Sequence, residues 1–115
     1  MPHDLRKSVW DALNACKKIQ SFTTGQTLEA YLADEMRCLA VERLFTILGE
    51  AFNRIDDVEP SFRDRFPEMG QIIGMRNLIT HGYDRVNDEM IFDSIRENVP
   101  TLADKLAEWL DEHQM

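Results

Sequence analysis

Apolar residues recur at steps of three and four through several long segments of this 115-residue chain. Over residues 34–56 the repeating apolar positions are Val41, Leu44, Phe45, Leu48, Phe52 and Ile55. This spacing places apolar side chains on one face of an α-helix, because a helix turns about 100° per residue. A half-buried strand would need strict alternation of apolar and polar residues, which no segment shows. The sequence therefore predicts an all-α protein.

The same periodicity and the capping residues predict where most of the helices lie. Long helices are expected over residues 4–20 and 34–56, and a third over Gly70–His81. A short helix is expected between the first two, with Thr27 as its N-cap, because a threonine hydroxyl can accept a bond from a free backbone N–H.

Prolines divide the rest of the chain. The segment 57–69 carries two of them and is predicted to be a loop with at most one helical turn. A last helix is expected over 89–112, capped by Asn87 or Asp88. Pro100 lacks a backbone donor and should bend this helix or split it in two. Together the segments predict an antiparallel bundle of four to five helices that forms a single domain over residues 1–115.

Composition narrows the possible partners. The formal net charge is −8, which argues against tight nonspecific binding to nucleic acid, because such binding depends on neutralising phosphates. It leaves room for a local basic site, and a partner protein with a basic face would suit the acidity. No apolar run approaches the ~20 residues that a membrane-spanning helix needs, so no membrane association is expected.

The two cysteines, Cys16 and Cys38, form no Cys-x-x-Cys pair and have no clustered histidines. They are predicted to be small buried side chains in a reducing compartment. We therefore expect a cytoplasmic protein with no metal site and no cofactor.

The stretch 72–83 concentrates the polar chemistry of the chain. One side of the predicted helix is apolar, with Ile72, Met75 and Ile79. The other side presents a cation, an amide, an imidazole and, if the helix extends far enough, a phenol: Arg76, Asn77, His81 and Tyr83. One interpretation is a solvated face that ends at Gly82, a residue type suited to a left-handed helix end. The alternative is a catalytic or binding site.

An Arg and a His near a phosphodiester suit metal-free RNA cleavage. The imidazole of His81 can move protons near neutral pH, and the guanidinium of Arg76 can stabilise charge on phosphoryl oxygens. Asn77 is a candidate to orient the imidazole or the phosphate. Cleavage needs both a base and an acid, so a single histidine is insufficient. A twofold homodimer that places two copies of His81 around one cleft would supply the second.

The polar face of the helix over 34–56 leaves two interpretations open. Glu50, Asn53 and Arg54 either form an ordinary solvated face or look across at the His81 side of the neighbouring helix. Gly49 lies inside this helix, where glycine costs ~1 kcal/mol relative to alanine. Close packing against another element is a reason for it to be there.

The longer pattern is similar to a known family. Arg76, four residues, His81, one residue and Tyr83 resemble the motif of the HepT-like branch of the HEPN superfamily. The flanking Ile-Ile-Gly-Met-Arg-Asn and His-Gly-Tyr strings strengthen the match, and Gly49-Glu50-Ala51 also resembles a HepT-like segment. The resemblance spans nearly the whole chain. One position departs: Thr46 stands where relatives often carry an acidic residue.

The resemblance implies a small all-α HEPN domain that forms a homodimer with its site at the protomer interface. It implies a metal-independent RNase toxin of a toxin–antitoxin pair, whose antitoxin is a minimal nucleotidyltransferase. Carried over residue by residue, Arg76 and His81 would be catalytic, Asn77 and Glu50 supporting, and Tyr83 the acceptor of an AMP group. The alternative function is a noncatalytic helical partner and substrate of the nucleotidyltransferase, with RNase activity lost.

Overall fold

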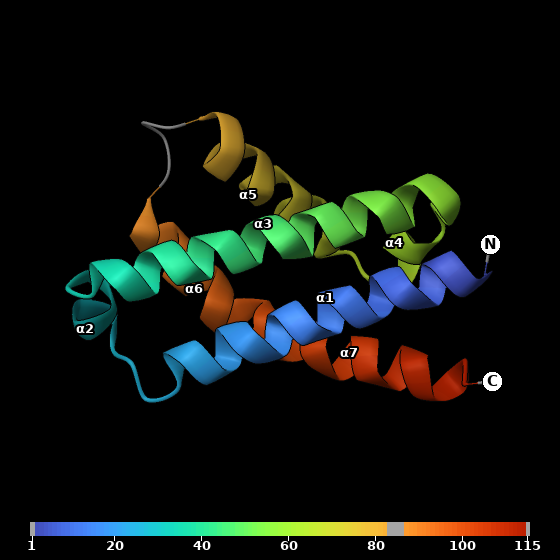
Figure 1. Ribbon diagram of the computed structural model, residues 1–115, viewed down its shortest axis with the longest axis horizontal. Coiled ribbons are helices and arrows are strands. Elements are labelled where there is room, and N and C mark those ends of the chain that lie inside the picture. The colour runs from blue at the N-terminus through green and yellow to red at the C-terminus, as the bar shows by residue number, and fades with distance from the viewer. Residues whose placement is uncertain (1, 83–86, 115) are drawn as a thin grey trace.

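The computed structural model describes residues 2–82 and 87–114, and within them every regular element is an α-helix, as predicted (Figure 1). The longer helices are α1 (Pro2–Thr23), α3 (Glu35–Val58), α5 (Met69–His81), α6 (Asp88–Glu97) and α7 (Val99–Glu112). Two short helices, α2 (Leu28–Leu32) and α4 (Phe62–Arg65), lie in the connections on either side of α3. None of the helices in the described ranges is both long enough and apolar enough to span a bilayer.

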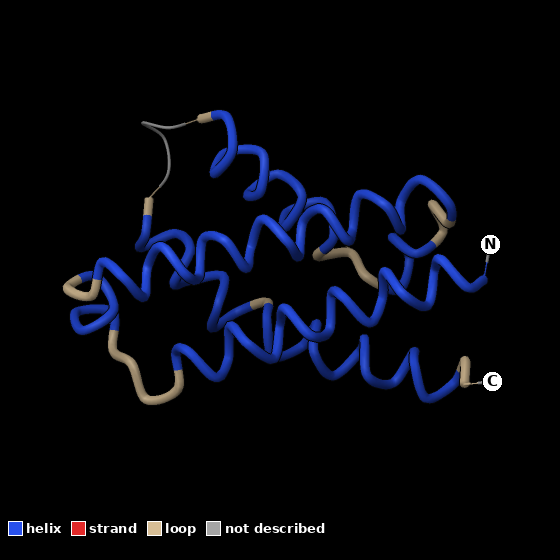
Figure 2. Tube along the Cα trace, viewed as in Figure 1, coloured by secondary structure: helices blue, strands red, loops and turns tan. Residues whose placement is uncertain are grey.

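Two long helices, α1 and α3, lie along each other and form the centre of the bundle (Figure 1). α7 packs on α1, whereas α5 packs on α3, and α6 contacts α7 and α2. Short loops on either side of α2 connect α1 to α3, and the two long helices run antiparallel (Figure 1 and Figure 2). α5 crosses α3 at an angle, and its C-terminal end points away from the bundle (Figure 1). The helix that carries the candidate site is therefore the outermost long helix on that side.

Helix ends follow the sequence signals closely. The Thr27 hydroxyl caps α2 by accepting a bond from the Ala30 N–H at 3.1 Å. The Asn87 side chain caps α6 by accepting a bond from the Glu89 N–H at 2.8 Å. α1 is longer than the predicted 4–20, because no residue before Gly25, whose φ is 74°, breaks the helix.

The predicted last helix is split in two, with α6 ending at Glu97 and α7 beginning at Val99. Pro100 lies in the first turn of α7, where a missing backbone donor has no intrahelical partner to lose. Asn98 closes α6, since its N–H donates to the Ser94 carbonyl oxygen at 2.9 Å. Of the two predicted effects of Pro100, the split is therefore the one found.

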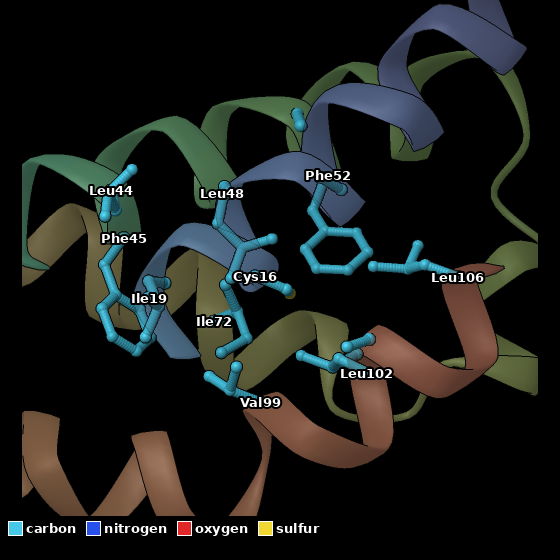
Figure 3. Close-up of a cluster of buried hydrophobic side chains, with 14 of the residues drawn as sticks. Cys16, Ile19, Leu44, Phe45, Leu48, Phe52, Ile72, Val99, Leu102 and Leu106 are labelled. Atoms are coloured by element: carbon cyan, nitrogen blue, oxygen red, sulfur yellow. The ribbon is translucent and has the colours of Figure 1, made fainter. Parts of the chain in front are cut away.

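The core forms where α1, α3, α5 and α7 meet. Figure 3 shows apolar side chains from these four helices pointing toward one another, among them Ile19, Leu48, Phe52, Ile72 and Leu102. Each of these five side chains is fully buried. Cys16 and Cys38 are buried and not bonded to each other, which confirms the prediction of two buried thiols. Burial raises the pKa of the Cys16 thiol to about 12, so this thiol stays protonated at neutral pH.

Candidate active site

The apolar side of α5 fixes how this helix is seated. Met69, Ile72 and Met75 are buried, and Ile79 is half-buried against the same core. The predicted packing side is thus confirmed, with its contact weakening toward the C-terminal end. His81 is the last residue of α5, and its side chain is exposed.

Gly82 caps the end of α5, and its N–H donates to the Leu78 carbonyl oxygen at 2.8 Å. The helix ends at the predicted glycine, whose φ of −107° is outside the left-handed region. Tyr83, the predicted AMP acceptor, lies in residues 83–86, outside the described part of the chain.

Arg76 is not the solvated cation of the first interpretation, because its side chain packs against α3 and is only 22% exposed. The contact is made possible by Gly49 in the middle of α3. A Cβ atom at position 49 would lie 2.3 Å from the Arg76 Cβ and 2.7 Å from its Cγ. The expectation that close packing explains Gly49 is therefore confirmed, and its neighbour is the arginine of the motif.

Two polar side chains hold the Arg76 guanidinium in a defined orientation. Its Nη1 donates to Asn77 Oδ1 at 3.0 Å, and its Nη2 lies 3.7 Å from Glu50 Oε2 in an ion pair. Its Nε is buried and has no hydrogen-bond partner among the described residues. Asn77 thus contacts the arginine, a role that the sequence analysis did not anticipate.

Thr80, on the next turn of α5, bonds to the backbone below it. Its hydroxyl donates to the Arg76 carbonyl oxygen at 2.9 Å. A threonine that bonds back to the preceding turn in this way adds no polar group to the site.

The sequence left open whether the polar residues of α3 are solvated or face α5, and the structure gives different answers for different residues. Glu50 faces α5, as its ion pair with Arg76 shows. Arg54 turns the other way, because its Nε donates to Ser8 Oγ at 3.3 Å and its Nη2 to Asp11 Oδ2 at 3.2 Å, both on α1. Thr46 is buried and donates to the Glu42 carbonyl oxygen within α3. Of these three, only Glu50 contributes to the candidate site.

A second polar cluster, unanticipated from the sequence, lies where α6 begins. It joins Tyr31 of α2, Cys38 and Glu42 of α3, and Asp88 of α6. Burial raises the pKa of the Glu42 carboxyl, and the neighbouring Asp88 carboxylate raises it further. Burial likewise raises the pKa of the Cys38 thiol, whose Sγ lies 3.2 Å from the Tyr31 carbonyl oxygen. Two acidic side chains, Glu42 and Asp88, are thus brought close together at the start of α6.

Within the described residues, no three His, Cys, Asp or Glu side chains are placed to hold a metal ion. The candidate site combines a guanidinium in contact with Asn77 and Glu50 and, five residues later, an exposed imidazole.

Comparisons with known proteins agree with the motif. The chain is 26% identical over 101 residues to a relative from Methanocaldococcus jannaschii, which covers 86% of this chain and 90% of the relative. A second relative from that organism is 27% identical over 107 residues, covering 91% of this chain and 86% of the relative. Both carry RNase in their names. A protein from Thermococcus cleftensis, named "Probable ribonuclease HepT", is 29% identical over 97 residues and covers 83% of this chain and 86% of its own.

No solved structure matches the chain at a significant level. A family model described as "Ribonuclease HepT-like" matches residues 12–109, nearly the full length. The chain belongs to the HepT-like ribonuclease family.

Proposed function

We propose that this protein is the RNase toxin of a toxin–antitoxin pair, that it cleaves RNA in the cytoplasm without a metal ion, and that a minimal nucleotidyltransferase neutralises it. Membership of the HepT-like ribonuclease family supports the RNase activity. The observation that carries the mechanism is the Arg76 guanidinium, which Asn77 and Glu50 hold beside α3 while His81 stays exposed at the end of the same helix.

The proposed reaction is an attack of the ribose 2′-oxygen on the adjacent phosphorus. One imidazole accepts the 2′-hydroxyl proton as the new O–P bond forms, and a second donates a proton to the 5′-oxygen as its bond to phosphorus breaks. The guanidinium of Arg76 stabilises the charge that develops on the nonbridging oxygens. The products are a 2′,3′-cyclic phosphate and a free 5′-hydroxyl.

A second protomer is part of this proposal. Residues five apart on a helix lie about 140° apart around its axis, so Arg76 and His81 of one chain face different directions. Arg76 turns toward α3, whereas His81 is exposed. A homodimer that brings two copies of α5 together would combine the arginine of one protomer with the histidine of its partner. It would also cover Ile73 and Leu78, which are only half-buried.

The test is cleavage of a labelled single-stranded RNA by purified protein in the presence of EDTA. The wild type should release fragments with 2′,3′-cyclic phosphate ends, and Arg76→Ala and His81→Ala should each lower the rate by at least ~10²-fold. Arg76→Lys should also be poor, because an ammonium cannot reproduce the planar fork of donors. Cleavage that persists in His81→Ala, or that needs added divalent metal, would contradict the mechanism.

Two matched variants control for the loss of a charge or of an imidazole. Arg54→Ala removes an arginine of α3 that contacts α1, and His113→Ala removes an exposed histidine beyond α7. Both should cleave at close to the wild-type rate. Thermal unfolding by circular dichroism should accompany every variant, so that a lost fold is not mistaken for a lost catalytic group.

Regulation through Tyr83 is the second part of the proposal. Tyr83 follows His81 by two residues, so an AMP group on it would place a phosphate anion close to the catalytic segment. That anion would compete with RNA for Arg76 and silence the enzyme without unfolding it.

Coexpression with a cognate minimal nucleotidyltransferase, followed by intact-mass measurement, tests this. AMP adducts are expected on the wild type and on Tyr31→Phe, whose tyrosine is fully buried, but not on Tyr83→Phe. Adducts at another residue, or adducted protein that still cleaves RNA, would contradict the regulatory part while leaving the RNase mechanism intact.

The net negative charge of the chain is the observation that favours a second, noncatalytic function. With a net charge of −8, RNA receives little general attraction, so a noncatalytic partner of the nucleotidyltransferase is the competing function. The RNA cleavage assay distinguishes the two functions. An RNase cleaves RNA and loses that activity in His81→Ala, whereas a noncatalytic partner cleaves no RNA in either form.

A further inference from the structure

We infer that Gly49 is a positioning residue for the reaction, because its missing side chain lets Arg76 lie against α3, where the guanidinium also pairs with Glu50. This inference rests on the proposed RNase function, since it assigns a task to Arg76 in catalysis. Gly49 itself touches no substrate.

The contact involves the rigid part of the arginine. The Arg76 atoms nearest to a Cβ at position 49 would be its own Cβ and Cγ, at 2.3 and 2.7 Å, and not the flexible end of the side chain. Cβ is fixed to the backbone, so the clash cannot be relieved by a change of rotamer. An added methyl group would have to push α5 away from α3, with the Ile72 carbonyl oxygen next at 3.5 Å.

The ion pair between the Arg76 guanidinium and Glu50 depends on this close packing of α5 against α3. This ion pair is already long, at 3.7 Å, so a further separation of α5 from α3 would break it. Asn77 would move together with Arg76, because both belong to α5, and would preserve only the 3.0 Å bond to Nη1. Displacement would thus move the guanidinium away from α3 and leave it held by Asn77 alone. A misplacement of about 1 Å at a group that acts on the reacting atoms can cost on the order of 10²-fold in rate.

A second glycine provides a matched comparison. Gly74 lies in α5 itself, two residues before Arg76, and a Cβ there would meet no described atom within 4 Å. Both glycines are inside helices, where alanine is the better helix former. Replacing either by alanine therefore gives the same gain in helix propensity, and only the change at Gly49 meets a neighbour.

The experiment compares four proteins: wild type, Gly49→Ala, Gly74→Ala and the double variant Gly49→Ala/Arg76→Gly. For each, kcat and KM are measured on the labelled RNA, and Tm is measured by circular dichroism. Gly74→Ala should raise Tm by about 4 °C. It is the control for stability alone, because Gly74 lies on the same side of α5 as Leu78 and His81. Gly49→Ala should lower kcat by ~10²-fold with a much smaller change in KM, because the arginine acts chiefly on the transition state. It should also lower Tm.

The double variant isolates the contact from the chemistry. Arg76→Gly removes both clashing atoms, so the double variant should recover the Tm that Gly49→Ala loses, yet remain inactive. If Gly49→Ala is unfolded at the assay temperature, this recovery shows that the contact with Arg76 is the cause, and kcat of wild type and Gly49→Ala is then compared at a temperature below the Tm of the variant. Gly49→Ala with kcat within twofold of wild type, or a double variant that recovers no Tm, would overturn the inference. Absence of cleavage by the wild type would instead refute the proposed function, and the Tm comparison would still report on the contact.

Discussion

The raised pKa of the Glu42 carboxyl group makes the stability of the fold depend on pH. Burial is the main cause of its raised pKa, and the negative charge of Asp88 adds to it. A raised pKa in the folded state means that the folded protein favours the neutral carboxylic acid. The contribution of Glu42 to stability is therefore fully present below its unfolded-state pKa, and it is lost as the pH rises through the raised pKa of the folded state.

Replacing this carboxyl group by an amide should remove that pH dependence. Glu42→Gln keeps the size of the side chain and cannot ionise, so it should unfold at a higher Tm than wild type near neutral pH. The difference should shrink toward pH 4, where the wild-type carboxyl is itself protonated. The measurement is Tm by circular dichroism from pH 4 to pH 8, with Glu97→Gln, an exposed glutamate of α6, as the control. Parallel Tm curves for wild type and Glu42→Gln would contradict the assignment.

Arg76 illustrates what a motif can and cannot predict. The spacing to His81 identified the residue, because the motif is a property of the sequence alone. The direction of its side chain depends on which helix covers α5, and that contact joins residues 27 positions apart, Gly49 and Arg76. Sequence supplied one hint, since a glycine inside a helix called for a close neighbour. The consequence is that Arg76→Ala removes packed methylene groups as well as a charge, so some loss of stability should accompany its loss of activity.

The N-terminus of α6 is capped by the side chain of Asn87. Asn87 Oδ1 accepts bonds from the Glu89 and Met90 N–H groups at 2.8 and 3.4 Å, and so satisfies two donors that an unprotected helix start would leave free. This cap therefore stabilises the first turn of α6.

Asn87→Ala should destabilise the protein by about 1 kcal/mol, the usual cost of losing an N-cap. For a domain of this size the expected decrease in Tm is about 4 °C. Asn87→Ser should retain most of the stability, because serine caps helices nearly as well. Equal Tm values for the alanine and serine variants would show that the cap contributes nothing measurable.

Elements were more predictable than their contacts. Thr27 and Asn87 marked helix starts, and Pro100 marked a break, because capping and the loss of a backbone donor are local effects. The pairing of Arg54 with α1 could not be predicted, since both faces of α3 carry polar residues at helical spacing. The proximity of Glu42 and Asp88 could not be predicted either. The two carboxyl groups are 46 positions apart in the sequence and come together only when the start of α6 lies near α3.

For the molecule as a whole, the main prediction is a homodimer. The exposed His81 and the half-buried Ile73 and Leu78 belong to the helix whose main described neighbour is α3 alone. Sedimentation velocity at micromolar concentration should give the mass of two chains. Leu78→Lys, which places a charge among these side chains, should shift the protein toward monomer and lower cleavage in the same proportion. A wild type that sediments only as a monomer, yet cleaves RNA, would exclude the shared site.

The burial of α5 decreases along the helix, so its two ends should differ in mobility. This helix is held firmly at its start by Met69 and Ile72, both fully buried, and progressively less toward His81. Its last turn can therefore fray while α1, α3 and α7 stay packed, because local opening costs less free energy where few buried contacts are broken. Backbone amides near His81 should exchange with deuterium well before those of α3, and at a rate that denaturant hardly changes. The end of α5 that carries the proposed catalytic histidine would then be the part that opens first and refolds fastest, so a partner could capture it without unfolding the rest.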